Sequence, residues 1–124
     1  SIKGVIRSIR ETTILCLEKL TMTTLGTTER PLRVAIIGSG GLSHFVIDEE
    51  MDDKIIKAMD SFDETTLGAI PESYLQSGSS EIKNWIAMTG AVAGTGLTME
   101  LVDYIPCYRS EAGTGTAQGF AYWD

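Results

Sequence analysis

The chain is 124 residues long, with 43% hydrophobic and 22% charged residues, which is the balance of one ordinary globular domain. Its 17 acidic residues against 10 basic ones give a net charge of −7, which argues against nucleic acid as the main partner, because phosphates need a positive face. No apolar run approaches the ~20 residues that span a bilayer, and the first residues lack the order of a secretory signal. We therefore expect a soluble, cytoplasmic protein that binds neither nucleic acid nor membranes.

The two cysteines, Cys16 and Cys107, lie far apart in the sequence, and neither belongs to a CxxC pair or has a histidine nearby. This spacing favours two free thiols in a reducing compartment. With one histidine and two isolated cysteines, a structural zinc site is not expected.

Residues 1–32 predict a helix followed by a loop. Apolar residues recur at helical spacing and continue along the segment, at Ile2, Val5, Ile6, Ile9, Leu15, Leu17 and Leu20. The threonines that follow, up to Thr28, disfavour a longer helix because β-branched side chains lose rotamer freedom there. We expect one helix to about Leu20 and then a loop.

Two apolar runs predict strands that are buried on both faces, as in a parallel sheet. The first is residues 34–37, which lead into the glycine-rich turn Gly38-Ser39-Gly40-Gly41. The second runs from Met99 to Ile105, and Pro106 is expected to end it. In open α/β sheets, active-site groups gather at the carboxyl ends of such strands.

The sequence between these strands predicts three helices. Residues 48–59 open with acidic side chains, which suit a helix N-terminus, and continue with an apolar stripe. A short helix is expected at 63–67, and a longer one at 81–91, capped by Ser79 or Ser80.

The last part of the chain is glycine-rich from Gly113 to Gly119 and then ends on Phe120-Ala121-Tyr122-Trp123 before Asp124. No repeat and no linker divides the sequence. Residues 1–124 are therefore expected to form a single α/β domain, with a sheet of buried strands flanked by helices.

The glycine-rich turn also suggests nucleotide binding, because successive amides can cradle a phosphate. However, Ser43 stands where the dinucleotide fingerprint has its third glycine, and no Gly-Lys-Ser/Thr follows. Ser39 does not fit a hydrolase nucleophile, since Ile37 replaces the first glycine of the nucleophile elbow. Ser43 is a poor nucleophile for His44 because adjacent side chains diverge. A tight turn is the better interpretation, and nucleotide binding is a weaker alternative.

His44 is the chain's only histidine and its strongest catalytic candidate. It follows a predicted strand and its turn, and imidazole suits proton transfer near neutral pH; a structural or surface role is the alternative. Glu81 opens a predicted helix, either as an acid favoured by the helix dipole or as a metal-binding carboxylate. Tyr108 and Arg109 follow the second strand, either as contacts to an anionic or aromatic substrate or as ordinary loop residues.

Read together, three segments resemble the class III extradiol ring-cleavage dioxygenases, in their catalytic (LigB-like) chain. The segments are residues 34–44, residues 80–85 and the C-terminal stretch from Ala112 to Trp123, and they occur in the family's order. The resemblance covers residues 33–124 and corresponds to the C-terminal half of such an enzyme. Residues 1–32 match no part of it.

The resemblance implies an enzyme that opens a catechol-type ring next to its two hydroxyls, with Fe(II) and O₂. Family members bind the iron through two histidines and one glutamate, which leaves positions open for substrate and oxygen. On this basis, His44 matches the histidine that acts as acid and base, and Glu81 matches the carboxylate ligand of the iron.

The sequence departs from the family in one respect: no histidine precedes His44, so the two histidine ligands are missing. We expect the chain to associate with itself or with a chain that supplies the N-terminal half, because missing strands would expose a sheet edge. The alternative is a non-enzymatic, degenerate domain, or a partner-binding fragment of the same fold.

Overall fold

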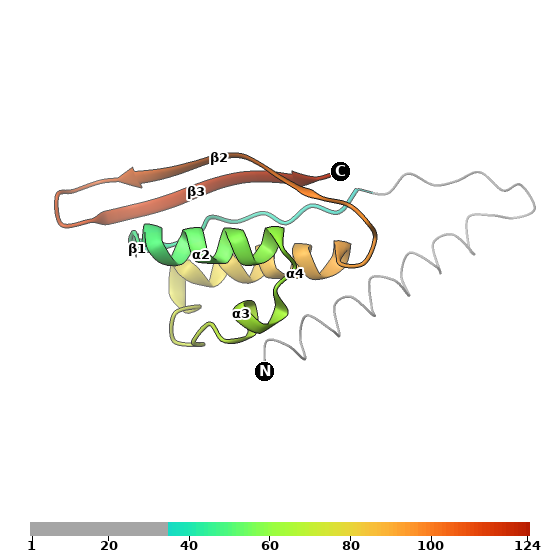
Figure 1. The fold of residues 1–124 in the computed structure, drawn as a ribbon. Helices are drawn as coiled ribbons and strands as arrows, with labels where there is room; N and C mark the ends of the chain where they lie inside the picture. The colour runs from blue at the N-terminus through green and yellow to red at the C-terminus, as the bar shows by residue number, and fades with distance from the viewer. Residues whose placement is uncertain (1–34) are drawn as a thin grey trace, which may run out of the picture.

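The computed structural model describes residues 35–124, which form a mixed α/β structure of three α-helices and a three-stranded antiparallel sheet (Figure 1). In chain order the elements are β1 (His44–Val46), α2 (Glu49–Asp60), α3 (Glu64–Gly68), the 3₁₀ helix η1 (Ser77–Glu81), α4 (Ile82–Val92), β2 (Met99–Tyr108) and β3 (Thr114–Trp123). The predicted mixed α/β class is confirmed. None of the helices in this part of the chain is long and apolar enough to cross a bilayer.

The helix expected to about Leu20, the loop after it, and Val34 of the first predicted strand lie outside the described residues. Within the described part, the three expected helices are α2, α3 and α4, each displaced by about one residue. The expected cap of the third helix by Ser79 or Ser80 is wrong: α4 continues directly from η1, its N-cap residue is Glu81, and no side chain caps it. The starts of α2 and α3 do follow the capping chemistry of the sequence. Asp48 accepts a hydrogen bond from the amide of Met51, and Asp63 accepts from the amides of Thr65 and Thr66.

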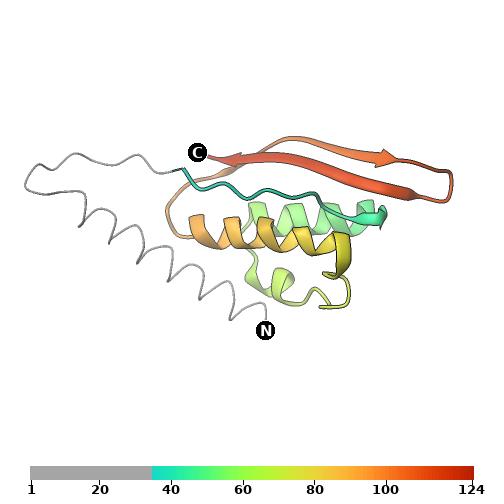
Figure 2. The ribbon, with the colours of Figure 1, turned by 180° about the vertical axis from the view of Figure 1, so that it is seen from behind.

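The sheet has the strand order β1–β3–β2, and every pairing is antiparallel. Figures 1 and 2 show α2 and α4 packed beneath one face of this sheet, while the opposite face is uncovered by any described element. The strongly paired part is the hairpin of β2 and β3; β1 is short and adds three residues at one end of β3.

The first predicted strand is not observed, and the expected parallel sheet of buried strands is wrong. Residues 35–41 are extended but form no ladder, and the side chain of Ile37 is 87% exposed. This segment joins the sheet only at its end, where the amide of Leu42 donates to the carbonyl of Ala117 at 2.9 Å. An apolar run forms a buried strand only where neighbouring strands pair with it, and residues 35–124 supply none here.

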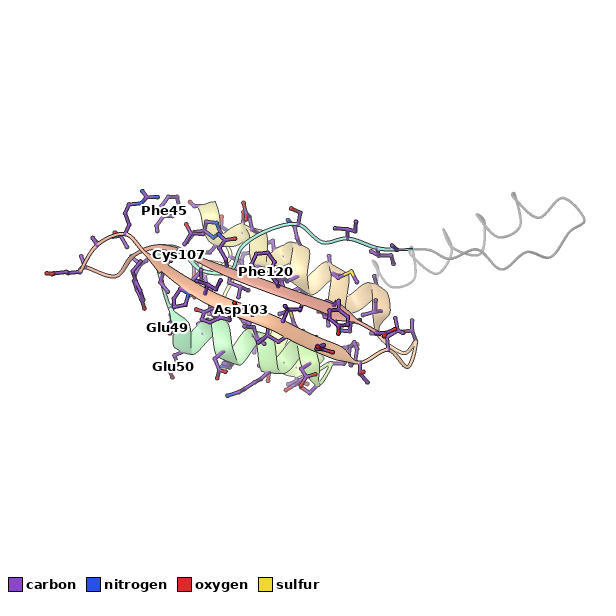
Figure 3. All side chains as sticks on the ribbon, turned by 90° about the horizontal axis from the view of Figure 1, so that it is seen from above. Phe45, Glu49, Glu50, Asp103, Cys107 and Phe120 are labelled. Carbon is purple, nitrogen blue, oxygen red and sulfur yellow. The ribbon has the colours of Figure 1, made fainter. Side chains whose placement is uncertain are left out.

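The second predicted strand exists as β2, but it is longer and more exposed than expected. Leu101, Val102 and Ile105 are all exposed, because β2 is an edge strand of a sheet with one open face. Pro106 does not end the strand but lies opposite Ala117 within it; an edge strand tolerates a residue without an N–H. The register is irregular between Leu101 and Asp103. Figure 3 looks onto the open face, where Asp103 lies opposite Phe120.

The glycine-rich C-terminal stretch, for which no element was predicted, forms β3. Gly115 shows why glycine is required there: a Cβ atom at this position would lie 2.2 Å from the carbonyl oxygen of Cys107 on the paired strand. The hydrophobic core lies between this strand and the helices. Its largest fully buried apolar side chains are Leu42, Ile55, Met59, Leu67, Leu75 and Ile82.

A buried carboxylate links the helices to the sheet. Asp52 of α2 is 0% exposed. It accepts hydrogen bonds from the amide of Ser43 at 3.0 Å, from the Ser43 hydroxyl at 2.6 Å and from the Tyr104 hydroxyl at 2.8 Å. Burial raises the pKa of Asp52, and the hydrogen bonds from Ser43 and Tyr104 oppose that shift.

We expect Asp52→Ala to lower the free energy of unfolding by about 2–4 kcal/mol, because it leaves the buried donors of Ser43 and Tyr104 unpaired. Urea denaturation followed by circular dichroism measures this change. The matched control is Asp53→Ala, one residue along, which removes only an exposed pair with Lys57 and is expected to cost less than about 0.5 kcal/mol. Equal effects of the two substitutions would show that the buried network does not stabilise the fold.

Asp52 also predicts a pH dependence of stability. Because its pKa is raised in the folded state, folding favours the protonated carboxyl, and this contribution is lost as the pH rises through the folded pKa. The unfolding free energy of the wild type minus that of Asp52→Asn should therefore fall from pH ~3 to pH 7. Asp53→Asn provides the control curve. A difference that rises with pH would contradict the assigned direction of the shift.

Candidate functional site

The imidazole of His44 is held in one orientation by the backbone around it. Its Nδ1 lies 2.7 Å from the carbonyl oxygen of Leu42, and its backbone amide donates to the Ser79 hydroxyl at 3.0 Å. Because a carbonyl oxygen can only accept, Nδ1 carries the proton in the neutral ring. Nε2 is then the nitrogen that is free to take up a proton.

Glu81 lies directly beside that nitrogen. Its Oε2 is 3.6 Å from His44 Nε2 and accepts a hydrogen bond from the Gly41 amide at 2.6 Å. The His44 side chain is 16% exposed and the Glu81 side chain 47%, so the pair opens to solvent on the carboxylate side. The structure therefore brings together the two residues that the sequence singled out, although helix α2 and helix α3 separate them along the chain.

Three glycines let the backbone approach this pair closely. An added Cβ would lie 2.6 Å from His44 Cβ at Gly78, 2.7 Å from His44 Cε1 at Gly41, and 2.9 Å from Glu81 Cβ at Gly40. Any side chain at these positions would displace the imidazole or the carboxylate. The glycine-rich turn thus has a packing role that its sequence pattern did not reveal.

The same geometry weakens the nucleotide-binding alternative. The Gly41 amide, which would face a phosphate, already donates to the Glu81 carboxylate. Neither Gly38, Gly40 nor Gly41 has the positive φ that alternates in an anion-binding nest. A negative carboxylate within the turn would also repel a phosphate.

The residue after His44 is under backbone strain. Phe45 has a φ of 68°, in the left-handed region that costs a non-glycine residue about 1–2 kcal/mol, and its side chain is largely exposed. Strain of this kind persists only where surrounding contacts impose it, and it clusters at functional sites. Here the contacts of Leu42 and Ser79 with His44 fix the backbone immediately before the strained residue.

A groove of about 1030 Å³ begins at Glu81 and runs along α4, between residues 35–41 and the second half of β3. Two side chains from α4 attach the glycine-rich turn to this helix. The Trp85 indole donates to the carbonyl of Gly40 at 2.8 Å, and the Asn84 amide donates to the carbonyl of Ser39 at 2.6 Å. Sequence reasoning did not assign these positioning contacts, since nothing in the local pattern shows which distant carbonyl a side chain reaches.

Tyr108 and Arg109, the predicted substrate contacts, do not line this groove. They lie where β2 leads into the turn toward β3, and both are exposed. The Tyr108 hydroxyl donates to Glu49 of α2, and this hydrogen bond raises the pKa of Tyr108. The structure therefore does not bring these two residues to Glu81.

Fe(II) is the cofactor implied by the resemblance, and the described residues alone do not fit it. Between residues 35 and 124, no group of three or more His, Cys, Asp or Glu side chains is placed to hold a metal ion. The chain's single histidine is His44, whose Nδ1 bonds the Leu42 carbonyl. Glu81 supplies one carboxylate, and one carboxylate does not bind Fe(II) tightly.

We expect Gly78→Ala to shift the His44 imidazole, because the new Cβ would overlap His44 Cβ, and to lower stability by about 1–3 kcal/mol. The chain has one histidine, so a single set of imidazole NMR resonances reports on it. Gly96→Ala is the control: its Cβ would meet nothing within 4 Å, so it strains only the backbone and should leave the imidazole resonances in place. Unchanged resonances in Gly78→Ala would show that Gly78 does not pack on His44.

No family model, no curated protein and no solved structure matches this chain.

Proposed function

We propose that this chain is the C-terminal half of a class III extradiol ring-cleavage dioxygenase, and that it acts only together with an N-terminal half that supplies the missing ligands. The observation that carries the proposal is the 3.6 Å approach of His44 Nε2 to Glu81 Oε2 at the mouth of a groove. These two residues match the acid/base histidine and the carboxylate ligand of the family. Their approach supports a shared site rather than two unrelated surface residues.

His44 would move the proton in this mechanism. With Nδ1 bonded to the Leu42 carbonyl, Nε2 accepts a proton from one hydroxyl of a catechol-type diol. The imidazolium then faces the Glu81 carboxylate, and the proton is returned to an oxygen of the product. Gly41 and Gly78 permit this arrangement, because a Cβ atom at either position would overlap the His44 side chain.

A second copy of these residues does not supply the missing ligands. A second copy would contribute only another His44, which its own Leu42 carbonyl orients toward its own Glu81. An Fe(II) site of the family's type would need two histidines from outside these 124 residues, to which Glu81 adds a carboxylate. The extended segment 35–41, which pairs with no described strand, offers a place where the N-terminal half can add strands.

A degenerate, non-enzymatic domain that binds a partner is the second candidate. It is favoured by the lack of any metal-binding group among residues 35–124 and by the single histidine of the whole chain. In that case the contacts of His44 and Glu81 would serve only to hold β1 against η1 and α4.

Free imidazole can stand in for the missing histidines in a test of the two candidates. The chain is reconstituted anaerobically with Fe(II) and imidazole, and oxygen uptake is measured on 3,4-dihydroxybenzoate and related catechols. We expect uptake that requires imidazole, is abolished by Glu81→Gln and falls about 10²–10⁴-fold in His44→Ala, the usual contribution of general acid–base catalysis.

Glu72→Gln is the matched control for Glu81→Gln, because Glu72 is a surface glutamate paired with Lys83 outside the groove. It should leave oxygen uptake unchanged. No uptake from folded protein at any imidazole concentration, or uptake that ignores Glu81→Gln, would reject the dioxygenase proposal in favour of the partner-binding domain.

A further inference from the structure

The half of the groove that lies away from Glu81 is apolar and uncovered by the described residues. It is lined by exposed hydrophobic side chains from the α4–β2 connection and from the hairpin, which are Leu97, Val102, Phe120 and Tyr122. Trp123 also lines it, and its indole N–H is buried with no hydrogen-bond partner among residues 35–124. A contiguous apolar surface of this kind is typical of a place where another segment packs.

The distribution of charge along the chain indicates which segment can occupy this half of the groove. Among residues 35–124, the only charged side chains that line the groove are the carboxylates of Glu81 and Asp124. Residues 35–124 contain 14 acidic and four basic residues, whereas residues 1–34 contain three acidic and six basic ones. A second copy of the strongly acidic part would be repelled, and the basic N-terminal segment would be attracted.

The N-terminal segment also reaches the groove. Residue 34 is bonded to Ala35, the first residue of the groove lining. A helix over residues 2–20, as the sequence predicts, would be about 28 Å long, longer than the ~16 Å of α4 along which the groove runs. The 14 residues from 21 to 34 can span up to ~46 Å, which is enough for such a helix to fold back onto the groove.

We propose that residues 2–20 dock in cis into this half of the groove as an amphipathic helix. The apolar stripe of Ile2, Val5, Ile6 and Ile9 would cover Val102 and Trp123, and the basic residues Lys3, Arg7 and Arg10 would complement the acidic surface around it. The covered half is the one distant from Glu81, so this inference holds whether or not the chain takes part in ring cleavage.

Tryptophan fluorescence of the full chain tests this directly, because both of its tryptophans, Trp85 and Trp123, line the groove. We expect Ile9→Asp to release the segment and to raise the acrylamide quenching constant about twofold or more, as an indole passes from shielded to open. Ser8→Asp is the matched control: it adds the same charge about 100° around the predicted helix from Ile9, outside the stripe of Ile2, Val5, Ile6 and Ile9, and should leave the quenching constant unchanged.

A second pair of variants changes the groove instead of the segment. Val102→Lys places a positive charge in the groove, where it would repel the basic segment, and should also raise quenching. Val46→Lys is its control, since Val46 is 63% exposed against 62% for Val102 but lies outside the groove. Both positions are exposed, so neither lysine disturbs the core.

The proposal is overturned if Ile9→Asp and Val102→Lys both leave the quenching constant at the wild-type value while circular dichroism shows folded protein. Light scattering, which gives the molecular mass, distinguishes docking in cis from docking on a second copy. If Ile9→Asp raises quenching and also converts a dimer into a monomer, the segment docks on a second copy and docking in cis is rejected. Raised quenching at an unchanged monomer mass supports docking in cis.

Discussion

The buried carboxylate of Asp52 is the contact on which the arrangement of the rest depends. It is the point where α2, the entrance of β1 and the middle of β2 meet, through its hydrogen bonds to Ser43 and Tyr104. Ser43 sits between Leu42, whose carbonyl orients the imidazole, and His44 itself. The orientation of the candidate catalytic side chain is thus coupled to a polar contact inside the core, because Leu42, Ser43 and His44 are consecutive residues of one backbone. A change in this polar contact is therefore expected to affect both the stability of the fold and the geometry of the candidate site.

The helices could be predicted from the sequence, because their signals are local. Capping residues such as Asp48 and Asp63 and the stripe of α2 act within a few residues of one another. Strands could not be predicted equally well, since a strand is defined by its neighbours. Residues 35–37 have the composition of a buried strand but no partner among the described residues, whereas the glycine-rich β3 has a poor composition and two partners. Long-range pairing overrode local preference in both cases.

For the candidate site, too, local features could be predicted from the sequence and long-range contacts could not. His44 and Glu81 could be chosen from the sequence by residue type and by resemblance. Their 3.6 Å approach could not, because it depends on how η1 lies against β1 and on glycines that admit the imidazole. Tyr108 and Arg109 were chosen by proximity along the chain to a strand end, and the antiparallel hairpin carries that end away from the groove. In a parallel sheet the same reasoning would have placed them beside it.

The edge strand β2 has a consequence for how chains of this kind can assemble. Pro106 lacks an N–H, the register is irregular near Leu101, and Glu100 and Asp103 are exposed acidic residues on the same strand. Such an edge cannot template a further strand along its whole length, so it resists cross-β stacking into fibrils even though its face is rich in apolar side chains. Orderly growth of the sheet is left to the opposite side, next to β1. Within residues 35–124, the sheet therefore has one border that disfavours strand addition and one, beside β1, that no described strand covers.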